Sequence, residues 1–298
     1  MSDDRVEIVE VGLRDGLQNE ATPVPFESRA DWFNRLAGAG LRRIEAGSFV
    51  SPKWVPQMAD TDRVLSAIQR SGDVSAEVLV PNDKGLERAL ASDADVVAVF
   101  TAASEAFNRK NINCSIDESI ERFRPVVAGA RAAGKPVRAY VSCVVGCPYE
   151  GAIEPGQVAD VVQKLLGIGV DEVSLGDTIG VARPREIHRL LDAVMPLVAT
   201  QRLALHCHDT RGQAIANIHA ALERGIRTFD SAVAGLGGCP YARGATGNVA
   251  TEDLLYLLAG EGMATGVDLE AVSALGNAIC EQLARANPSR VGRALAAS

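Results

Sequence analysis

Short runs of β-branched and apolar residues alternate with longer amphipathic stretches from one end of this chain to the other. We expect strands at 6–11, 42–46, 75–80, 95–100, 137–141, 172–175, 203–207 and 228–233. Between them apolar residues recur every three or four positions, a spacing typical of helices, as in the stripe formed by Val158, Val161, Val162, Leu165 and Leu166. These regular strand–helix repeats predict an α/β fold, a closed parallel (β/α)8 TIM barrel, and a doubly wound open sheet is the alternative.

The length and composition are compatible with one large domain. The chain has 298 residues, of which 47% are hydrophobic and 23% charged, and we expect a single TIM-barrel domain over 1–298. Residues after about 260 exceed what the eighth helix needs. They predict an additional C-terminal helical segment over about 261–298 that covers one end of the barrel or forms a contact, and we expect a homo-oligomer.

The charge distribution excludes two classes of partner. The net charge is −8, and acidic and basic residues are interspersed. We therefore expect neither nucleic acid nor a membrane surface as a partner. The six cysteines are too sparse for a disulfide scaffold. The first residues do not resemble a targeting peptide, so we expect a cytoplasmic protein with reduced thiols.

The segment His206-Cys207-His208-Asp209-Thr210 predicts a metal site. Side chains alternate along a strand, so His206 and His208 point to the same face at the end of the seventh predicted strand. Asp15, after the first strand, is a natural anionic third ligand, and Asn248 is either a fourth ligand or a helix N-cap. Imidazole with oxygen donors suits Mg²⁺ or Mn²⁺, while zinc and an iron triad are alternatives.

Other reactive residues also follow predicted strands, where a parallel barrel places its active site. Arg14 is suited to stabilising a carboxylate or an enolate. Glu45 and Asp177 are candidates for acid–base chemistry or for supporting the site. Cys239 lies in a glycine-rich loop after the eighth strand, and it is either a catalytic thiol or an inert buried cysteine.

These motifs resemble the 3-hydroxy-3-methylglutaryl-CoA lyase family of metal-dependent TIM-barrel lyases. The likeness covers nearly the whole chain, and its most specific part is the cysteine loop at 233–241. It also runs through the segments at 11–20, 47–58, 110–115, 140–151, 174–180 and 206–210.

The resemblance implies a function and a set of site residues. Asp15, His206, His208 and Asn248 would bind the divalent metal. Arg14 and Ser48 would bind the acyl-CoA thioester substrate, and Cys239, Arg14, Asp177 and Glu45 would be catalytic. The expected reaction is retro-Claisen cleavage of 3-hydroxy-3-methylglutaryl-CoA to acetoacetate and acetyl-CoA.

The chain departs from the family pattern at two places. Leu13 replaces a proline, and Ala46-Gly47 replaces a pair of β-branched or hydroxyl residues. We expect Ala46-Gly47 to leave more room beside the acyl chain, which makes a lyase for longer 3-hydroxy-3-alkylglutaryl-CoA thioesters one alternative. A metal-dependent aldolase or Claisen synthase would not need the cysteine loop. A non-catalytic paralogue is the third alternative, against which the intact residue set argues.

Overall fold

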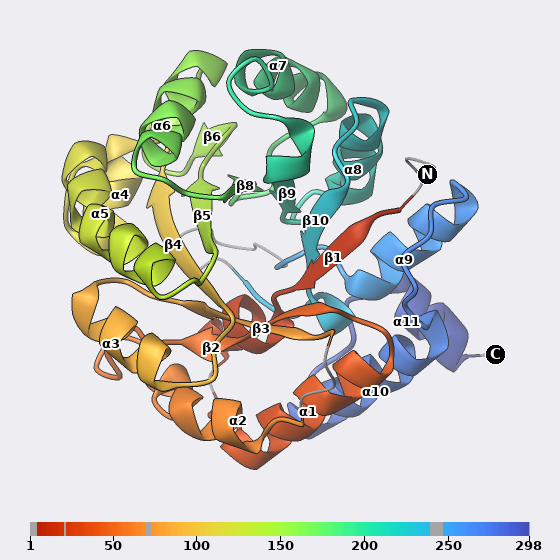
Figure 1. Ribbon diagram of the computed structural model, residues 1–298. Coiled ribbons are helices and arrows are strands. Elements are labelled where there is room, and N and C mark those ends of the chain that lie inside the picture. Colours follow the sequence, from red (N-terminus) through yellow and green to blue (C-terminus); the bar gives the residue numbers. More distant parts are fainter. Residues whose placement is uncertain (1–4, 21, 70–72, 239–246, 298) are drawn as a thin grey trace.

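The computed structural model describes residues 5–20, 22–69, 73–238 and 247–297. Parallel strands close into a barrel in the order β1-β10-β9-β8-β5-β4-β3-β2. The barrel strands are β1 (Glu7–Glu10), β2 (Arg43–Ser48), β3 (Ser75–Leu79), β4 (Val96–Ala102), β5 (Val137–Ser142), β8 (Glu172–Asp177), β9 (Leu203–Cys207) and β10 (Thr228–Ser231). The predicted TIM barrel is therefore confirmed (Figure 1). Each predicted strand is present, with its ends shifted by no more than two residues.

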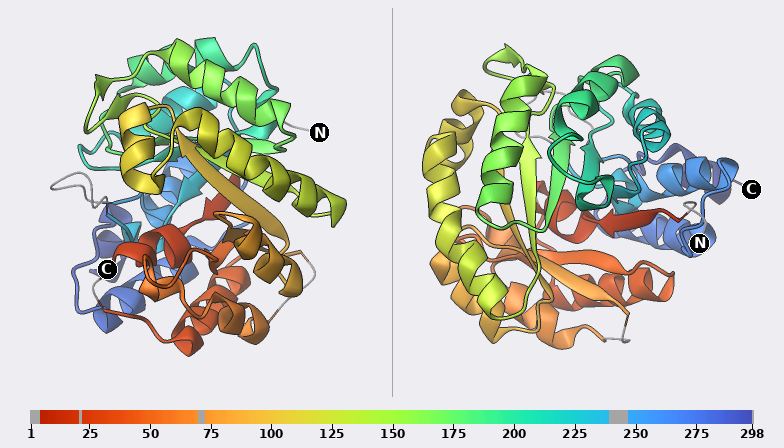
Figure 2. Two further views of the ribbon diagram at one scale, coloured as in Figure 1. Left: turned by 90° about the vertical axis from the view of Figure 1, so that its left-hand side faces the viewer. Right: turned by 45° about the horizontal axis from the view of Figure 1, so that its top comes forward.

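Helices form the outer layer around the strands (Figure 2). They are α1 (Phe26–Gly38), α2 (Thr61–Ala67), α3 (Asp83–Ala91), α4 (Glu105–Ile112), α5 (Ile116–Ala132), α6 (Pro155–Gly167), α7 (Pro184–Val194), α8 (Ala214–Glu223), α9 (Thr251–Gly260), α10 (Leu269–Gln282) and α11 (Arg290–Ala296). Their starts follow local sequence: Ser115 and Glu118 form a reciprocal capping box at α5, and α6 and α7 each begin with proline. The C-terminal α10 packs against both α1 and α9.

Two local features were absent from the sequence-based prediction. A short antiparallel hairpin, β6 (Gly146–Cys147) with β7 (Gly151–Ala152), follows β5. A π-helical turn, Gly12–Gly16, follows β1. Both lie in connections after barrel strands, at the end of the barrel where a parallel sheet carries its functional residues.

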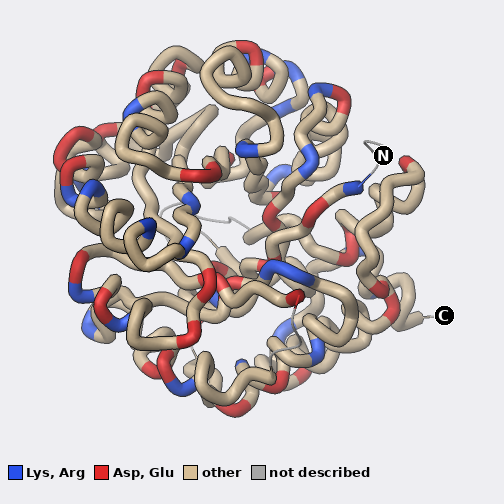
Figure 3. Tube along the Cα trace, viewed as in Figure 1, with Lys and Arg blue, Asp and Glu red and all other residues tan. Residues whose placement is uncertain are grey.

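The barrel interior carries charged side chains, whereas the outward side chains of the strands pack with the helices in a large apolar core. Near the base, Arg43 forms ion pairs with Glu77 and Glu172. Further along the axis, the fully buried Arg138 is paired with Asp230. Acidic and basic residues are mixed over the outer helices and also occur on several barrel strands (Figure 3).

Candidate metal centre

The predicted site residues that the structure describes gather at the carboxyl ends of the barrel strands. Asp15 lies in the π-helical turn after β1, His206 is on β9, and His208 directly follows β9. One potential ligand atom from each of these three residues lies within 4.8 Å of the other two. His208 remains extended beyond β9 because it forms an antiparallel bridge with Asn248. The three residues therefore form a group that could hold a metal ion.

The π-helical turn places Arg14 and Asp15 side by side over the barrel. The carbonyl oxygen of Val11 accepts hydrogen bonds from the backbone N–H of Arg14 and of Gly16, both at 3.2 Å. Buried Glu10 anchors the start of this turn, because its Oε1 accepts from the backbone N–H of Gly12 at 2.8 Å. The same oxygen accepts from the N–H of Val233 at 2.9 Å. Glu10 thus connects the turn with the chain that leads into the glycine-rich loop.

Two buried atoms at this site that could bind a metal ion have no hydrogen-bond partner among the described residues. They are Nδ1 of His208 and Oδ1 of Asn248. The amide nitrogen of Asn248 donates to Oδ2 of Asp15 and to the carbonyl oxygen of Leu236, both at 3.0 Å, so its oxygen is left as an unused acceptor. An unpaired buried acceptor is costly unless a cation or another donor meets it. The donor set of this group therefore fits a divalent ion.

The charges around the site hold Asp15 ionised. Burial would raise the pKa of Asp15, but charge interactions, the largest with Arg14 and smaller ones with the two histidines, outweigh it and lower the pKa. The two histidines differ from each other. Burial and the neighbouring His206 lower the pKa of His208 to about 4. Burial also acts to lower the pKa of His206, but its hydrogen bond and charge interaction with Asp230 raise it.

Arg14 is held in one orientation by two carboxylates and an aromatic ring. Its Nε and Nη2 both lie 2.7 Å from Oε2 of Glu45, and its Nη1 donates to Asp15 at 2.8 Å. The guanidinium carbon lies 5.1 Å from the centre of the Tyr140 ring. Burial raises the pKa of Glu45, and its second oxygen has no partner among the described residues. The guanidinium is therefore fixed beside the three-residue group.

Asp177 and Ser48 are both buried and both engaged with the backbone. The two oxygens of Asp177 accept from the N–H groups of Val181 at 3.0 Å and Ala182 at 2.9 Å, and burial raises the pKa of this carboxyl. The Ser48 hydroxyl accepts from the N–H of Val50 at 3.1 Å. In this structure both side chains stabilise the loops that follow their strands.

The expectation that Ala46-Gly47 enlarges the acyl pocket is not supported by the packing. A Cβ on Gly47 would lie 2.5 Å from the Thr61 hydroxyl at the start of α2, and Ala46 is buried in the core around the barrel. The β-bulge between Glu45 and Gly47 accompanies this arrangement. The small side chains at these positions leave space for α2, outside the barrel mouth.

Cys239 lies outside the described residues, as does the segment 239–246. The residues on either side of this segment lie close together: a Cβ on Gly247, which has a φ of +97°, would meet the carbonyl oxygen of Gly237 at 2.7 Å. Gly237 in turn lies against Asn248. Cys114, Cys147, Cys207 and Cys280 are buried free thiols, and Cys143 is also buried.

Sequence reasoning missed the polar side chains beneath the site, namely Arg138, Tyr140, Ser174 and Asp230. Asp230 lies opposite His206 in the register of β10 and β9, and its Oδ2 is 3.1 Å from Nδ1 of His206. Arg138 donates to Tyr140 at 2.7 Å and to Asp230 at 2.5 Å. A signal was present, because polar or charged residues recur at alternate positions in strands that must be buried on both faces.

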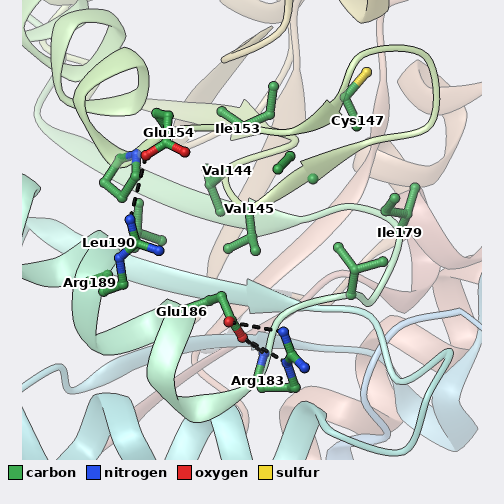
Figure 4. Close-up of a pocket in the computed structure, with 15 residues that line it drawn as sticks. Val144, Val145, Cys147, Ile153, Glu154, Ile179, Arg183, Glu186, Arg189 and Leu190 are labelled. Carbon is green, nitrogen blue, oxygen red and sulfur yellow. Dashed lines mark hydrogen bonds and ion pairs between the residues drawn. The ribbon is translucent and has the colours of Figure 1, made fainter.

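A separate cavity of about 380 Å³ lies between the β6–β7 hairpin and α7 (Figure 4). Val144, Val145, Ile153 and Leu190 contribute apolar walls. The two arginines of its lining are each paired with a glutamate, Arg183 with Glu186 at 3.0 Å and Arg189 with Glu154 at 3.5 Å. Asp15, His206 and His208 are not part of its lining.

No helix in the described part of the chain is long and apolar enough to cross a membrane.

Known proteins provide an independent comparison. A family model described as HMGL-like matches residues 5–279. The hydroxymethylglutaryl-CoA lyase of Pseudomonas mevalonii is 58% identical over 98% of this chain and 97% of its own length. A Pseudomonas aeruginosa protein named 3-hydroxy-3-isohexenylglutaryl-CoA/hydroxy-methylglutaryl-CoA lyase is 55% identical, covering 98% of each chain. The crystal structure of hydroxymethylglutaryl-CoA lyase from Pseudomonas aeruginosa has 54% identity and a TM-score of 0.97, covering 99% of this chain and 98% of the other. With these similarities over nearly its full length, the chain belongs to the HMGL-like family, among the hydroxymethylglutaryl-CoA lyases.

Proposed function

We propose that this protein cleaves 3-hydroxy-3-methylglutaryl-CoA to acetoacetate and acetyl-CoA. The observation that carries the proposal is the group Asp15, His206 and His208 beside the fixed guanidinium of Arg14, at the carboxyl end of the barrel. The named relatives at 58% and 55% identity support the same substrate class. In the proposed reaction the substrate's tertiary hydroxyl loses its proton, the adjacent carbon–carbon bond breaks, and the acetyl-CoA enolate takes up a proton.

A divalent ion, Mg²⁺ or Mn²⁺, would be held by Asp15, His206, His208 and Asn248. The unpaired Nδ1 of His208 and Oδ1 of Asn248 support this ligand set. When bound, the ion would lower the pKa of the substrate hydroxyl and neutralise its carboxylate. The mixed nitrogen and oxygen donors favour Mg²⁺ or Mn²⁺ over a thiolate-preferring ion, and zinc and iron are included in the test below.

Arg14 would stabilise the negative charge that develops on the thioester oxygen. Glu45 and Asp15 fix the guanidinium through bonds of 2.7 and 2.8 Å, so little reorganisation is needed during the reaction. Glu45 therefore serves first as the residue that orients Arg14. Asp177 would act on the reaction indirectly, by holding the loop 178–182 next to His208. Ser48, at the end of β2, would have a similar indirect effect on substrate binding.

Cys239 would protonate the departing acetyl-CoA enolate. The close approach of Gly237 and Gly247 beside Asn248 supports this role, because these two glycines flank the region that contains Cys239 and lie against a proposed metal ligand. A thiol is suited to this step because its ordinary pKa, about 8.5, lies near neutrality.

Product analysis tests the proposal. Purified protein would first be stripped with a chelator, then supplied with Mg²⁺, Mn²⁺, Zn²⁺ or Fe²⁺ and given 3-hydroxy-3-methylglutaryl-CoA. We expect acetoacetate and acetyl-CoA in equal amounts with Mg²⁺ or Mn²⁺, and a much slower reaction with His208→Ala. A parallel assay with a longer 3-hydroxy-3-alkylglutaryl-CoA tests whether longer acyl chains are also cleaved. The name of the 55% identical relative includes such a substrate. Turnover of only a 2-keto acid would refute the lyase proposal in favour of an aldolase.

We also propose a reducing, cytoplasmic location and a homo-oligomeric assembly. The free thiols of Cys114, Cys147, Cys207 and Cys280 support the first, because cysteines of proteins in oxidising compartments commonly form disulfides, whereas thiols stay reduced in the cytosol. The assembly is tested by the molar mass of the purified protein in light scattering. A monomer at micromolar concentration would contradict it.

A further inference from the structure

Asp230 lies directly beneath the candidate metal centre, although it is none of its ligands. It is on β10, opposite His206 in the register with β9, and it is 1% exposed. Its side chain points into the barrel interior and reaches the imidazole of His206, where Oδ2 lies 3.1 Å from Nδ1.

Three side chains converge on the Asp230 carboxylate. Oδ1 accepts from Nη2 of Arg138 at 2.5 Å, and Oδ2 accepts from the hydroxyl of Ser174 at 2.7 Å in addition to its contact with His206. A carboxylate paired with an arginine can only accept hydrogen bonds. The proton between Asp230 and His206 must therefore be on Nδ1 of the imidazole, which leaves Nε2 as the nitrogen with a free lone pair.

The other histidine of the group has no such support. No carboxylate among the described residues forms a hydrogen bond with the His208 ring, and its buried Nδ1 has no partner there. The two histidines are therefore not equivalent: one has its ring orientation and tautomer set by a carboxylate, and the other is placed by the bridge between His208 and Asn248.

We propose that Asp230 is a positioning residue for the metal centre, which fixes His206 in the Nδ1–H tautomer and presents Nε2 to the ion. Arg138 and Ser174 donate hydrogen bonds that hold the Asp230 carboxylate next to Nδ1 of His206. This inference rests on the proposed metal-dependent function. A carboxylate behind a histidine ligand sets the ring orientation and raises the basicity of the ligand, and its loss lowers metal affinity by about 10- to 100-fold.

The tautomer can be measured in the unmodified protein. The chain has four histidines, so two-bond ¹H–¹⁵N spectra of histidine-labelled, metal-stripped protein at alkaline pH contain few signals. Signals are assigned with His188→Gln, His219→Gln and His208→Gln. We expect the Nδ1–H form for His206. An Nε2–H form would overturn the inference without the need for any variant at Asp230.

A pair of charge-matched variants tests the consequence for the metal. Asp230→Asn removes the carboxylate that contacts His206, whereas Glu172→Gln removes a negative charge from the other side of Arg138 and does not touch a histidine. Mn²⁺ affinity is measured by electron paramagnetic resonance of the free ion, and folding by circular dichroism. We expect about 10- to 100-fold weaker binding for Asp230→Asn and a change of less than about threefold for Glu172→Gln.

The outcomes separate the role of Asp230 from the proposed metal dependence. Equal weakening in both variants, or unchanged Mn²⁺ affinity in Asp230→Asn, would overturn the role of Asp230. If Asp230→Asn does not fold, the tautomer in the unmodified protein decides. If the unmodified protein binds no Mn²⁺, the metal dependence in the proposed function is wrong, while the tautomer still reports separately on Asp230 and His206.

Discussion

Replacing Glu10 with glutamine should change how the stability of this protein depends on pH. Glu10 is fully buried between the start of the π-helical turn and Val233, and burial raises its pKa from 4.5 to about 7. Its partners are the backbone N–H groups of Gly12 and Val233 and the hydroxyl of Thr251, which donates at 2.6 Å. These three hydrogen bonds lower the pKa, but they do not offset the cost of burying the charge.

The sign of the effect follows from which state keeps the proton. Below pH 4.5 Glu10 is protonated in both states. Between pH 4.5 and about 7 the unfolded chain releases the proton while the folded protein retains it, so the free energy of unfolding falls as pH rises. The loss reaches about 3 kcal/mol above pH 7, at about 1.4 kcal/mol per pH unit. In Glu10→Gln this contribution is absent at every pH.

Urea unfolding at pH 4.5, 6 and 8, in the presence of a chelator, measures the difference between Glu10→Gln and the unmodified protein. We expect that difference to shift by about 3 kcal/mol in favour of the variant from pH 4.5 to pH 8. Exposed Glu87→Gln is the control and should show no such shift. A difference for Glu10→Gln that stays constant with pH would show that the folded protein holds this carboxylate ionised, which would refute the reasoning.

Four further changes probe the site. His208→Ala should abolish Mn²⁺ binding and lower kcat/KM, and the decrease should correspond to a loss of several kcal/mol of transition-state stabilisation. Full activity of the unmodified protein after exhaustive chelation would contradict the metal requirement. Arg14→Lys keeps the charge but loses the forked donor, so kcat should fall by about 100-fold with a smaller change in KM, and equal changes in both would point to simple binding. Cys239→Ser should lower turnover by about two to four powers of ten while Mn²⁺ affinity is retained, and substrate should protect the unmodified protein from alkylation; near-normal turnover would leave the thiol a loop-packing role. Gly47→Ala should cost about 1–3 kcal/mol of stability through its clash with Thr61, yet leave the preference between methyl and longer alkyl substrates unchanged, and an altered preference would place this position at the acyl pocket after all.

The sequence alone was sufficient to predict the barrel, because local periodicity carries that information. The alternation of apolar runs with helical stripes depends only on residues that are close in the sequence. At 203–207, for example, the predicted and observed strands coincide. The same local rule placed His206 and His208 on one face. Asp15 could be added because parallel strands all end at the same rim of a barrel, so a residue after β1 and residues after β9 must be near one another.

Only the tertiary structure decided which residues contact and orient the proposed metal ligands. Asp230 supports His206 because the register between β10 and β9 sets them opposite each other, and no local pattern at either position specifies that register. The same limit applies at Ala46-Gly47, where the β-bulge in β2 and the approach of Thr61 determine that a Cβ on Gly47 would face α2. A sequence fixes the periodicity of each element locally, whereas cross-strand contacts depend on how separate elements are aligned when the barrel closes.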